Sequence, residues 1–259
     1  MDWLTRAALA CLLLSIHSPV FAQTSLARPW KLEAELGANL FFGASKQGAV
    51  LSRGKLEHKS ARWELKLAVA YDYGEAQDGD GLRFVNKRSW LSQTSIDYLP
   101  QGIFNPFVFG IAEGSLQRQI EMRRSGGAGV RVRFIDNERT LFDFSVAGSI
   151  EHTRPRINIP GEITKEAQSI GRWSARLGAR HRFAEDRMQF DLVSFYKPSM
   201  DDFGADYTVE VTTSVQYALT SMLSLKLSLV DVYDNLAVSR GAPSNNDGQL
   251  FFGLLASVK

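Results

Sequence analysis

The chain of 259 residues has little of several features that define common protein classes. It contains 1 Cys, 8 Pro and 21 Gly, which excludes a disulfide scaffold and any collagen-like or low-complexity class. Neither sign of charge dominates, because the chain contains 30 Lys and Arg residues and 28 Asp and Glu residues. A net charge of +2 therefore gives no indication of nucleic-acid binding. Beyond the N-terminal stretch, no apolar run is long enough for a membrane helix.

The residues that are present, 44% of them hydrophobic and 11% aromatic, exclude an intrinsically disordered chain. Residues 1–22 combine Arg6, an apolar stretch over residues 7–14 and a small residue, Ala22, at their end. This arrangement predicts a secretory signal peptide that is cleaved after Ala22. A lipoprotein attachment site at Cys11 is the alternative, but it would divide the apolar stretch. We expect a short linker at residues 23–29 and one domain at residues 30–259.

Apolar and polar residues alternate through most of this domain, which is the pattern of strands with two unlike faces. Leu32, Ala34 and Leu36, for example, alternate with Glu33 and Glu35. A helix would place these apolar residues all around its surface. The pattern predicts about twelve strands, at residues 30–42, 49–59, 62–73, 84–99, 106–118, 126–136, 140–152, 170–183, 188–197, 205–219, 222–233 and 248–258.

The links between these strands alternate in length. Five links are short, at residues 60–61, 100–105, 137–139, 184–187 and 220–221, and the first of these is Ser60-Ala61. The links between them are mostly longer and polar, at residues 74–83, 119–125, 153–169, 198–204 and 234–247. A meander of hairpins that crosses a membrane has short turns on one side and long loops on the other. A soluble sandwich has no reason to sort its links in this way.

Aromatic residues bracket several of the strands. Ten residues at about 3.3 Å rise, tilted by about 40°, span about 25 Å, the height of the apolar band of an outer-membrane barrel. In such barrels, aromatic residues are enriched where the apolar band meets water. The alternative interpretation is that these aromatic residues belong to the core of a soluble β protein. The aromatic residues predicted at the two interfaces are Trp63, Tyr73, Trp90, Tyr98, Trp173, Phe183, Tyr207 and Tyr217.

Together these signals predict an all-β protein, a transmembrane antiparallel up-and-down β-barrel of the bacterial outer-membrane type. The sheet must close, because lipid offers no hydrogen-bond partner to an open edge. Apolar side chains would then face lipid, and the charged set would face the lumen. Inward-facing arginines form a predicted basic stripe of Arg131, Arg133, Arg172, Arg176, Arg180 and Arg182, and the predicted acidic partners are Glu33, Glu35, Glu64, Asp143 and Glu151.

Two interpretations of this lumen remain open. Arginine binds carboxylate and phosphate in a bidentate fork, so the stripe could line a path for anions. Alternatively the stripe and its acidic partners form a structural network of ion pairs. The near balance of acidic and basic residues favours the network.

Catalysis and metal binding find little support. His58, His152 and His181 do not stand at metal-ligand spacing from another His, Cys or carboxylate, so no metal or cofactor is expected. No Gly-x-Ser-x-Gly elbow is present. An enzyme acting on lipid would need a serine beside a histidine on the outer wall. We therefore expect a protein that is not an enzyme.

Residues 30–153 resemble the salt-induced outer-membrane protein family, filed as domain of unknown function 481. The resemblance rests on the alternating strand over residues 32–42, on Trp63-Glu64-Leu65 after a tight turn, and on the glycine-containing run over residues 127–132. It also rests on residues 135–141 and 144–148. The resemblance implies an outer-membrane β-barrel with no established activity or catalytic residues. One departure is the C-terminus, which ends on Lys259 where such barrels usually end on an aromatic residue.

These observations predict an outer-membrane barrel of structural or stress-related role with a salt-bridged lumen. The alternative is a narrow anion-preferring channel that uses the arginine-lined wall. An outer-membrane enzyme and a soluble periplasmic barrel for an apolar ligand are less favoured alternatives. Expected partners are outer-membrane lipid and lipopolysaccharide, periplasmic chaperones, the barrel-assembly machinery and small anions.

Overall fold

The computed structural model describes residues 30–41, 47–77, 80–156 and 167–258. The described residues form a closed barrel of twelve antiparallel strands, which confirms the predicted fold class. No helix in these ranges is long and apolar enough to cross a membrane. The elements are β1 (Trp30–Phe41), β2 (Gln47–Lys59), β3 (Trp63–Gln77), β4 (Arg83–Tyr98), β5 (Phe104–Ser115), β6 (Ile120–Asp136), β7 (Thr140–Pro155), β8 (Gln168–Phe183), β9 (Met188–Pro198), β10 (Tyr207–Ala218), β11 (Leu223–Asp234), the short 3-10 helix η1 (Val238–Arg240) and β12 (Asn246–Val258).

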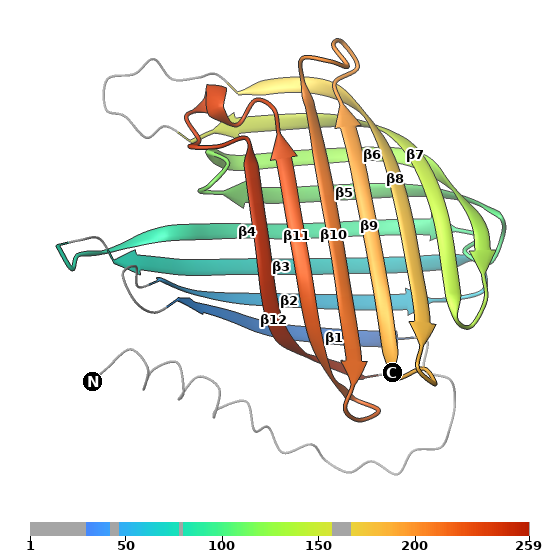
Figure 1. The fold of residues 1–259 in the computed structure, drawn as a ribbon. Coiled ribbons are helices and arrows are strands. Elements are labelled where there is room, and N and C mark those ends of the chain that lie inside the picture. The colour runs from blue at the N-terminus through green and yellow to red at the C-terminus, as the bar shows by residue number, and fades with distance from the viewer. Residues whose placement is uncertain (1–29, 42–46, 78–79, 157–166, 259) are drawn as a thin grey trace.

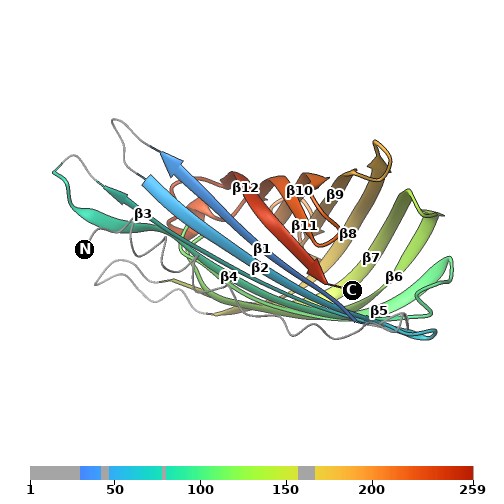
Figure 2. The same ribbon diagram turned by 90° about the horizontal axis from the view of Figure 1, so that it is seen from below.

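The barrel closes where β1 pairs with β12, with Leu32 opposite Val258 and Ala38 opposite Phe252 (Figure 2). Every other strand pairs with its neighbours in the sequence, so no edge is left open. Figure 1 shows β2–β5 running behind β9–β12 at a large angle to them. This crossing is expected, because the strands of a closed barrel tilt relative to its axis.

The alternation of the sequence becomes two faces of the barrel wall. Side chains on a strand point to opposite sides in turn. At the seam, Leu36 and Leu254 are exposed on the outer face, whereas Glu35 and Leu255 are buried inside. The exposed large apolar side chains thus lie on the outside of the molecule, which is the distribution of a protein surrounded by lipid.

The two ends of the barrel differ in their connections. At the end that we call the turn end, links of three to five residues join the strands, at 60–62, 99–103, 137–139, 184–187 and 219–222. Side chains cap these turns: Oδ1 of the Asn137 side chain accepts hydrogen bonds from the backbone N–H groups of Arg139 and Thr140, at 3.0 and 2.7 Å. The other end, the loop end, carries the links 156–167, 199–206 and 235–245.

Two of the predicted long links are shorter than expected. The link expected at 119–125 spans only residues 116–119, because β6 begins at Ile120. The link expected at 74–83 spans residues 78–82, because β3 continues to Gln77. The sequence of residues 120–125 does not indicate a strand, because Arg123 points inward and Arg124 points outward, so both faces are polar there. The alternation of short and long links is therefore weaker than the sequence suggested.

Two glycines in the middle of β6 allow a close approach of β7. A Cβ atom on Gly127 would lie 2.2 Å from the carbonyl oxygen of Gly148, and one on Gly129 would lie 2.4 Å from that of Val146. Such distances are far inside van der Waals contact, so only glycine fits at these positions. The glycine-containing run over residues 127–132 therefore shapes the wall within a strand.

The predicted signal peptide at residues 1–22 and the linker at residues 23–29 lie outside the described residues. They remain predictions.

Candidate functional site: the barrel lumen

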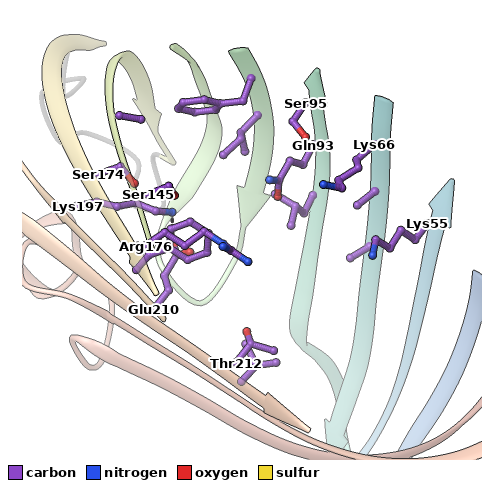
Figure 3. Close-up of a pocket in the computed structure, with 18 of the residues that line it drawn as sticks. Lys55, Lys66, Gln93, Ser95, Ser145, Ser174, Arg176, Lys197, Glu210 and Thr212 are labelled. Carbon is purple, nitrogen blue, oxygen red and sulfur yellow. Dashed lines mark hydrogen bonds and ion pairs between the residues drawn. The ribbon is translucent and has the colours of Figure 1, made fainter. Parts of the chain in front are cut away.

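The lumen contains a cavity of about 710 Å³. Its lining includes Lys59 and Arg139 at the turn end and Arg118 and Asp247 at the loop end, so the cavity extends along the barrel. Fourteen basic and ten acidic side chains belong to its lining. Figure 3 shows Arg176, Lys197 and Glu210 together on one side of the cavity, with Lys55 and Lys66 on the strands that face them.

All six arginines of the predicted basic stripe line this cavity. Alternation along β6 and β8 directs them inward. Arg131 contacts Asp97 at 2.8 Å, and Arg180 contacts Asp191 at 2.7 Å. Arg182 differs from them, since its Nε donates to the amide oxygen of Gln189 at 3.2 Å and it forms no ion pair within the described residues. Most of the stripe is therefore neutralised locally, and Arg182 is not.

The five predicted acidic partners all take part in ion pairs inside the barrel. Three of them contact the arginine stripe: Glu64 lies 3.8 Å from Arg133, Glu151 lies 3.0 Å from Arg172, and Asp143 contacts Arg131 and Arg176. The other two contact lysines instead, because their strand lies on the far side of the barrel. Glu33 pairs with Lys31, and Glu35 pairs with Lys226 at 2.7 Å.

A buried ion-pair network at the loop end was missed by sequence analysis. Arg123, only 6% exposed, contacts Glu113 at 3.2 Å, Glu151 at 3.4 Å and Asp234 at 3.3 Å. Since Arg123 belongs to β6 and Asp234 to the end of β11, this network joins opposite walls of the barrel. Arg240, in the β11–β12 link, also contacts Asp234.

Arg118, in the β5–β6 link, belongs to the same network through a 2.7 Å contact with Glu113. Burial alone would lower the pKa of the Arg118 guanidinium, but the attraction of the Glu113 carboxylate outweighs burial and raises this pKa. The only sequence signal for the network was the pair Arg123-Arg124, which looked like part of a polar loop.

The network divides the lumen. A second, smaller cavity of about 370 Å³ lies beside the loops and is lined in part by Asp206 and Arg240. Arg123, Glu151 and Arg172 line both this cavity and the main one. These three side chains therefore stand between the two spaces and constrict the lumen near its loop end.

Not all apolar side chains face lipid as expected, because some of them face the lumen. Leu51 and Phe251 are buried inside the barrel near the β1–β12 seam, where the guanidinium carbon of Arg53 lies 4.2 Å from the centroid of the Phe251 ring. On β5, Phe107 and Phe109 line the main cavity. The irregular alternation of the β5 sequence thus has a structural cause, since apolar residues occupy both of its faces.

The eight predicted interface aromatics alternate with the inward-facing residues of their strands, four toward each end, and Trp90 and Trp173 also border the main cavity. Trp63, Tyr98, Phe183 and Tyr217 are exposed near the turn end, and Tyr73, Trp90, Trp173 and Tyr207 stand in the half nearer the loops. Trp63 and Tyr98 contact each other, with ring centroids 4.8 Å apart. The structure adds Trp30, Phe104 and Phe134 to the exposed rings of the turn end.

A serine and a histidine also lie together on the outer wall. Nδ1 of His152 and the hydroxyl of Ser169 are 2.8 Å apart. A catalytic triad also needs a group that orients the histidine. Within the described part of the chain, the His152 side chain hydrogen-bonds to Ser169, and no third group orients it. No group of three or more His, Cys, Asp or Glu among the described residues could hold a metal ion.

A closed antiparallel barrel with an apolar outer wall and a charged lumen defines the class of outer-membrane-type β-barrels. More particularly, the chain belongs to the family described as protein of unknown function, DUF481, whose sequence model matches residues 34–258. The match thus extends well beyond residues 30–153, which carry the resemblance described above. No curated protein matches the chain.

Solved structures resemble the barrel at very low sequence identity. The COG4313 outer membrane channel from Pseudomonas putida F1 has a TM-score of 0.51 and 9% identity, over 92% of this chain and 99% of that chain. The translocator domain of the autotransporter NalP from Neisseria meningitidis has a TM-score of 0.49 and 8% identity, over 91% and 90%. The NanC porin has a TM-score of 0.49 and 7% identity, over 88% and 100%. The first of these supports the barrel fold.

Proposed function

We propose that the protein is a narrow outer-membrane channel that prefers small anions. The observation that supports this proposal is the main cavity, whose lining includes residues at both ends of the barrel. Fourteen basic against ten acidic side chains in that lining favour anions, because a ring of positive charge attracts and coordinates them. The constriction formed by Arg123, Glu151 and Arg172 limits the path to small solutes.

A structural barrel without conductance is the second candidate. The extensive ion pairing favours it, since Arg131, Arg133, Arg172, Arg176 and Arg180 each contact at least one carboxylate. Paired charges offer less attraction to a passing ion than free ones. On either candidate the protein has no catalytic role.

The proposed location is the outer membrane. The exposed apolar side chains of the outer wall and the two groups of aromatic rings match a bilayer with an interface at each end. Lipopolysaccharide and other outer-membrane lipids would contact this wall, and periplasmic chaperones and the barrel-assembly machinery would deliver it there.

Planar-bilayer recording of the purified full chain tests the channel proposal. We expect a steady current carried by chloride. In a potassium chloride gradient, the sign of the reversal potential should show that chloride is more permeant than potassium. A folded protein that carries no current would contradict the channel and favour the structural candidate. Folding is checked on the same sample, because folded barrels migrate differently on a denaturing gel before and after heating.

A matched pair of arginine substitutions tests the membrane location. Leu229 is exposed on the outer face of β11, and Thr212 faces the cavity from the neighbouring strand β10. Leu229→Arg should lower the free energy of unfolding in lipid vesicles by about 2–4 kcal/mol, because a charge on the lipid face is poorly solvated. Thr212→Arg should have a much smaller effect. Equal effects would contradict a lipid-facing outer wall.

A further inference from the structure

One side of the main cavity is aromatic and aliphatic. Phe107 and Phe109 line it from β5, with ring centroids 6.1 Å apart. Ile111 on the same strand and Leu91 on β4 extend this surface. Leu91 lies diagonally across from Ile111, because the residue opposite Ile111 is Gln93, two positions along β4. Val108, between the two phenylalanines, points outward and is 52% exposed.

This apolar surface is not needed to fill the lumen, because it lines open space. Elsewhere inside the barrel, the apolar side chains Leu51 and Phe251 are almost fully buried. Phe107 and Phe109, by contrast, remain partly accessible in the cavity. Accessible apolar surface inside a concave site is typical of places that bind an apolar part of a ligand.

Cationic groups lie directly against this surface. The guanidinium carbon of Arg131 lies 5.3 Å from the ring centroid of Phe107. Arg131 and Arg176 share the carboxylate of Asp143, and Arg131 shares Asp97 with Lys66. Each of these two carboxylates thus serves two cations. The Nε of Arg131 lies 3.8 Å from Asp143 and has no hydrogen-bond partner within the described residues, so the pairing of Arg131 with that carboxylate is loose.

A third aromatic ring, that of Phe195, lies close to Arg176 and Lys197. Phe195 of β9 lines the cavity, and the guanidinium carbon of Arg176 lies 5.9 Å from its centroid. The amino group of Lys197 lies 4.8 Å from the same centroid. Figure 3 shows Arg176 and Lys197 extending from the wall into the same part of the cavity. Positive charge therefore lies between two aromatic surfaces.

We infer that this part of the lumen binds a carboxylate that carries an apolar body, such as an arylalkanoate. The carboxylate is held by Arg131 and Arg176, and the apolar body lies on Phe107, Phe109 and Ile111. The cavity of about 710 Å³ lies within the range of small-molecule sites. This inference deepens the proposed channel function and rests on it only for the claim that the bound molecule blocks or follows the ion path.

Block of the chloride current by phenylbutyrate tests the inference in planar bilayers. Phenylbutyrate should reduce the wild-type current at concentrations where acetate, which lacks the apolar body, does not. Phenylbutanol, which lacks the charge, should also fail to block. Calorimetric titration of the detergent-solubilised full chain with the same three compounds measures binding without any current, so it separates this inference from the channel proposal.

A pair of neighbouring substitutions locates the site. Phe109→Ala should weaken phenylbutyrate binding by about tenfold, because a contact between two aromatic rings contributes about 1.4 kcal/mol, which corresponds to that factor. Val108→Ala removes an apolar side chain from the outer face of the same strand and should leave binding unchanged. Both variants are checked for the heat-dependent gel shift, and the comparison of ligands on the wild type does not depend on either variant.

The outcomes separate the two proposals. Phenylbutyrate binding without any current supports the inference and contradicts the channel. A current that acetate and phenylbutyrate reduce equally contradicts the inference, because the apolar body would then add nothing. Equal binding of phenylbutanol and phenylbutyrate also contradicts it, since the cationic groups would then play no part. A folded Phe109→Ala variant that binds phenylbutyrate as tightly as the wild type would place the site elsewhere.

Discussion

The two ends of the lumen use the same ion pair, arginine with aspartate, but they connect different parts of the barrel. At the loop end, Arg123 of β6 contacts Asp234 of β11, and the two side chains are 7% and 3% exposed. Toward the turn end, Arg180 of β8 contacts Asp191 of the adjacent strand β9, and these are 39% and 24% exposed. The first pair joins opposite walls, whereas the second joins strands that the backbone already connects.

The difference in burial gives the two pairs different roles. Removing one partner of a buried pair leaves an uncompensated charge and costs about 3–5 kcal/mol. An exposed pair contributes about 0–1 kcal/mol, because water screens it. The loop-end network therefore stabilises the shape of the constriction. The Arg180–Asp191 pair contributes little to stability and mainly sets the charge along the cavity.

Asp234→Asn should have the largest effect of the variants that test this comparison. Within the described residues Asp234 is the acidic partner of Arg240, so the variant leaves a largely buried guanidinium without a carboxylate. We expect the free energy of unfolding to fall by about 3–5 kcal/mol. Urea unfolding in lipid vesicles, followed by tryptophan fluorescence, measures this change.

Asp191→Asn is the matched control toward the turn end. It also removes the carboxylate partner of one arginine, Arg180, but at an exposed site, so the loss should stay within about 1 kcal/mol. The single-channel current should increase in Asp234→Asn, because the β11–β12 link loses its contact with Asp234, and it should not increase in Asp191→Asn. Equal losses of stability in the two variants would remove the distinction between the ends.

The fold and the inward direction of the arginine stripe could be predicted because both depend on local alternation. Arg172, Arg176 and Arg180 face the cavity as a direct consequence of their spacing along one strand. The start of β6 was missed because a strand with polar residues on both faces carries no such signal, as Arg123 and Arg124 show.

The partners of these charges could be predicted only in part. Asp143 and Glu151 lie on the strand next to the stripe, so sequence order was enough to propose them. The contact between Arg123 and Asp234 joins residues 111 positions apart and depends on the curvature of the barrel, and the contact of Arg240 with Asp234 depends on how the β11–β12 link folds. The strand pattern contains no information on either.

Arg182→Glu tests the charge-setting role of the cavity wall toward the turn end. Arg182 donates to Gln189 and makes no ion pair within the described residues, so the substitution leaves no carboxylate unpaired. We expect the reversal potential in a potassium chloride gradient to shift toward cation preference, because two units of positive charge are lost from the lining. Arg182→Gln should give about half of that shift. The unfolding free energy should change by no more than about 0.5 kcal/mol in both variants. An unchanged reversal potential would show that ions do not pass this wall.

The smallest expected effect concerns the backbone at the two ends. Ala184, in a turn-end link, has a φ of 51°, and Gln119, in a loop-end link, has a φ of 54°. The left-handed conformation disfavours residues with a Cβ by about 1–2 kcal/mol, and this is offset in part by the greater freedom of glycine in the unfolded chain. Ala184→Gly should therefore stabilise the barrel by up to about 1 kcal/mol in urea unfolding. Gln119→Gly should not, because it also removes a buried side chain at the loop end. Stabilisation by both variants would mean that side-chain packing matters no more at the loop end than at the turn end.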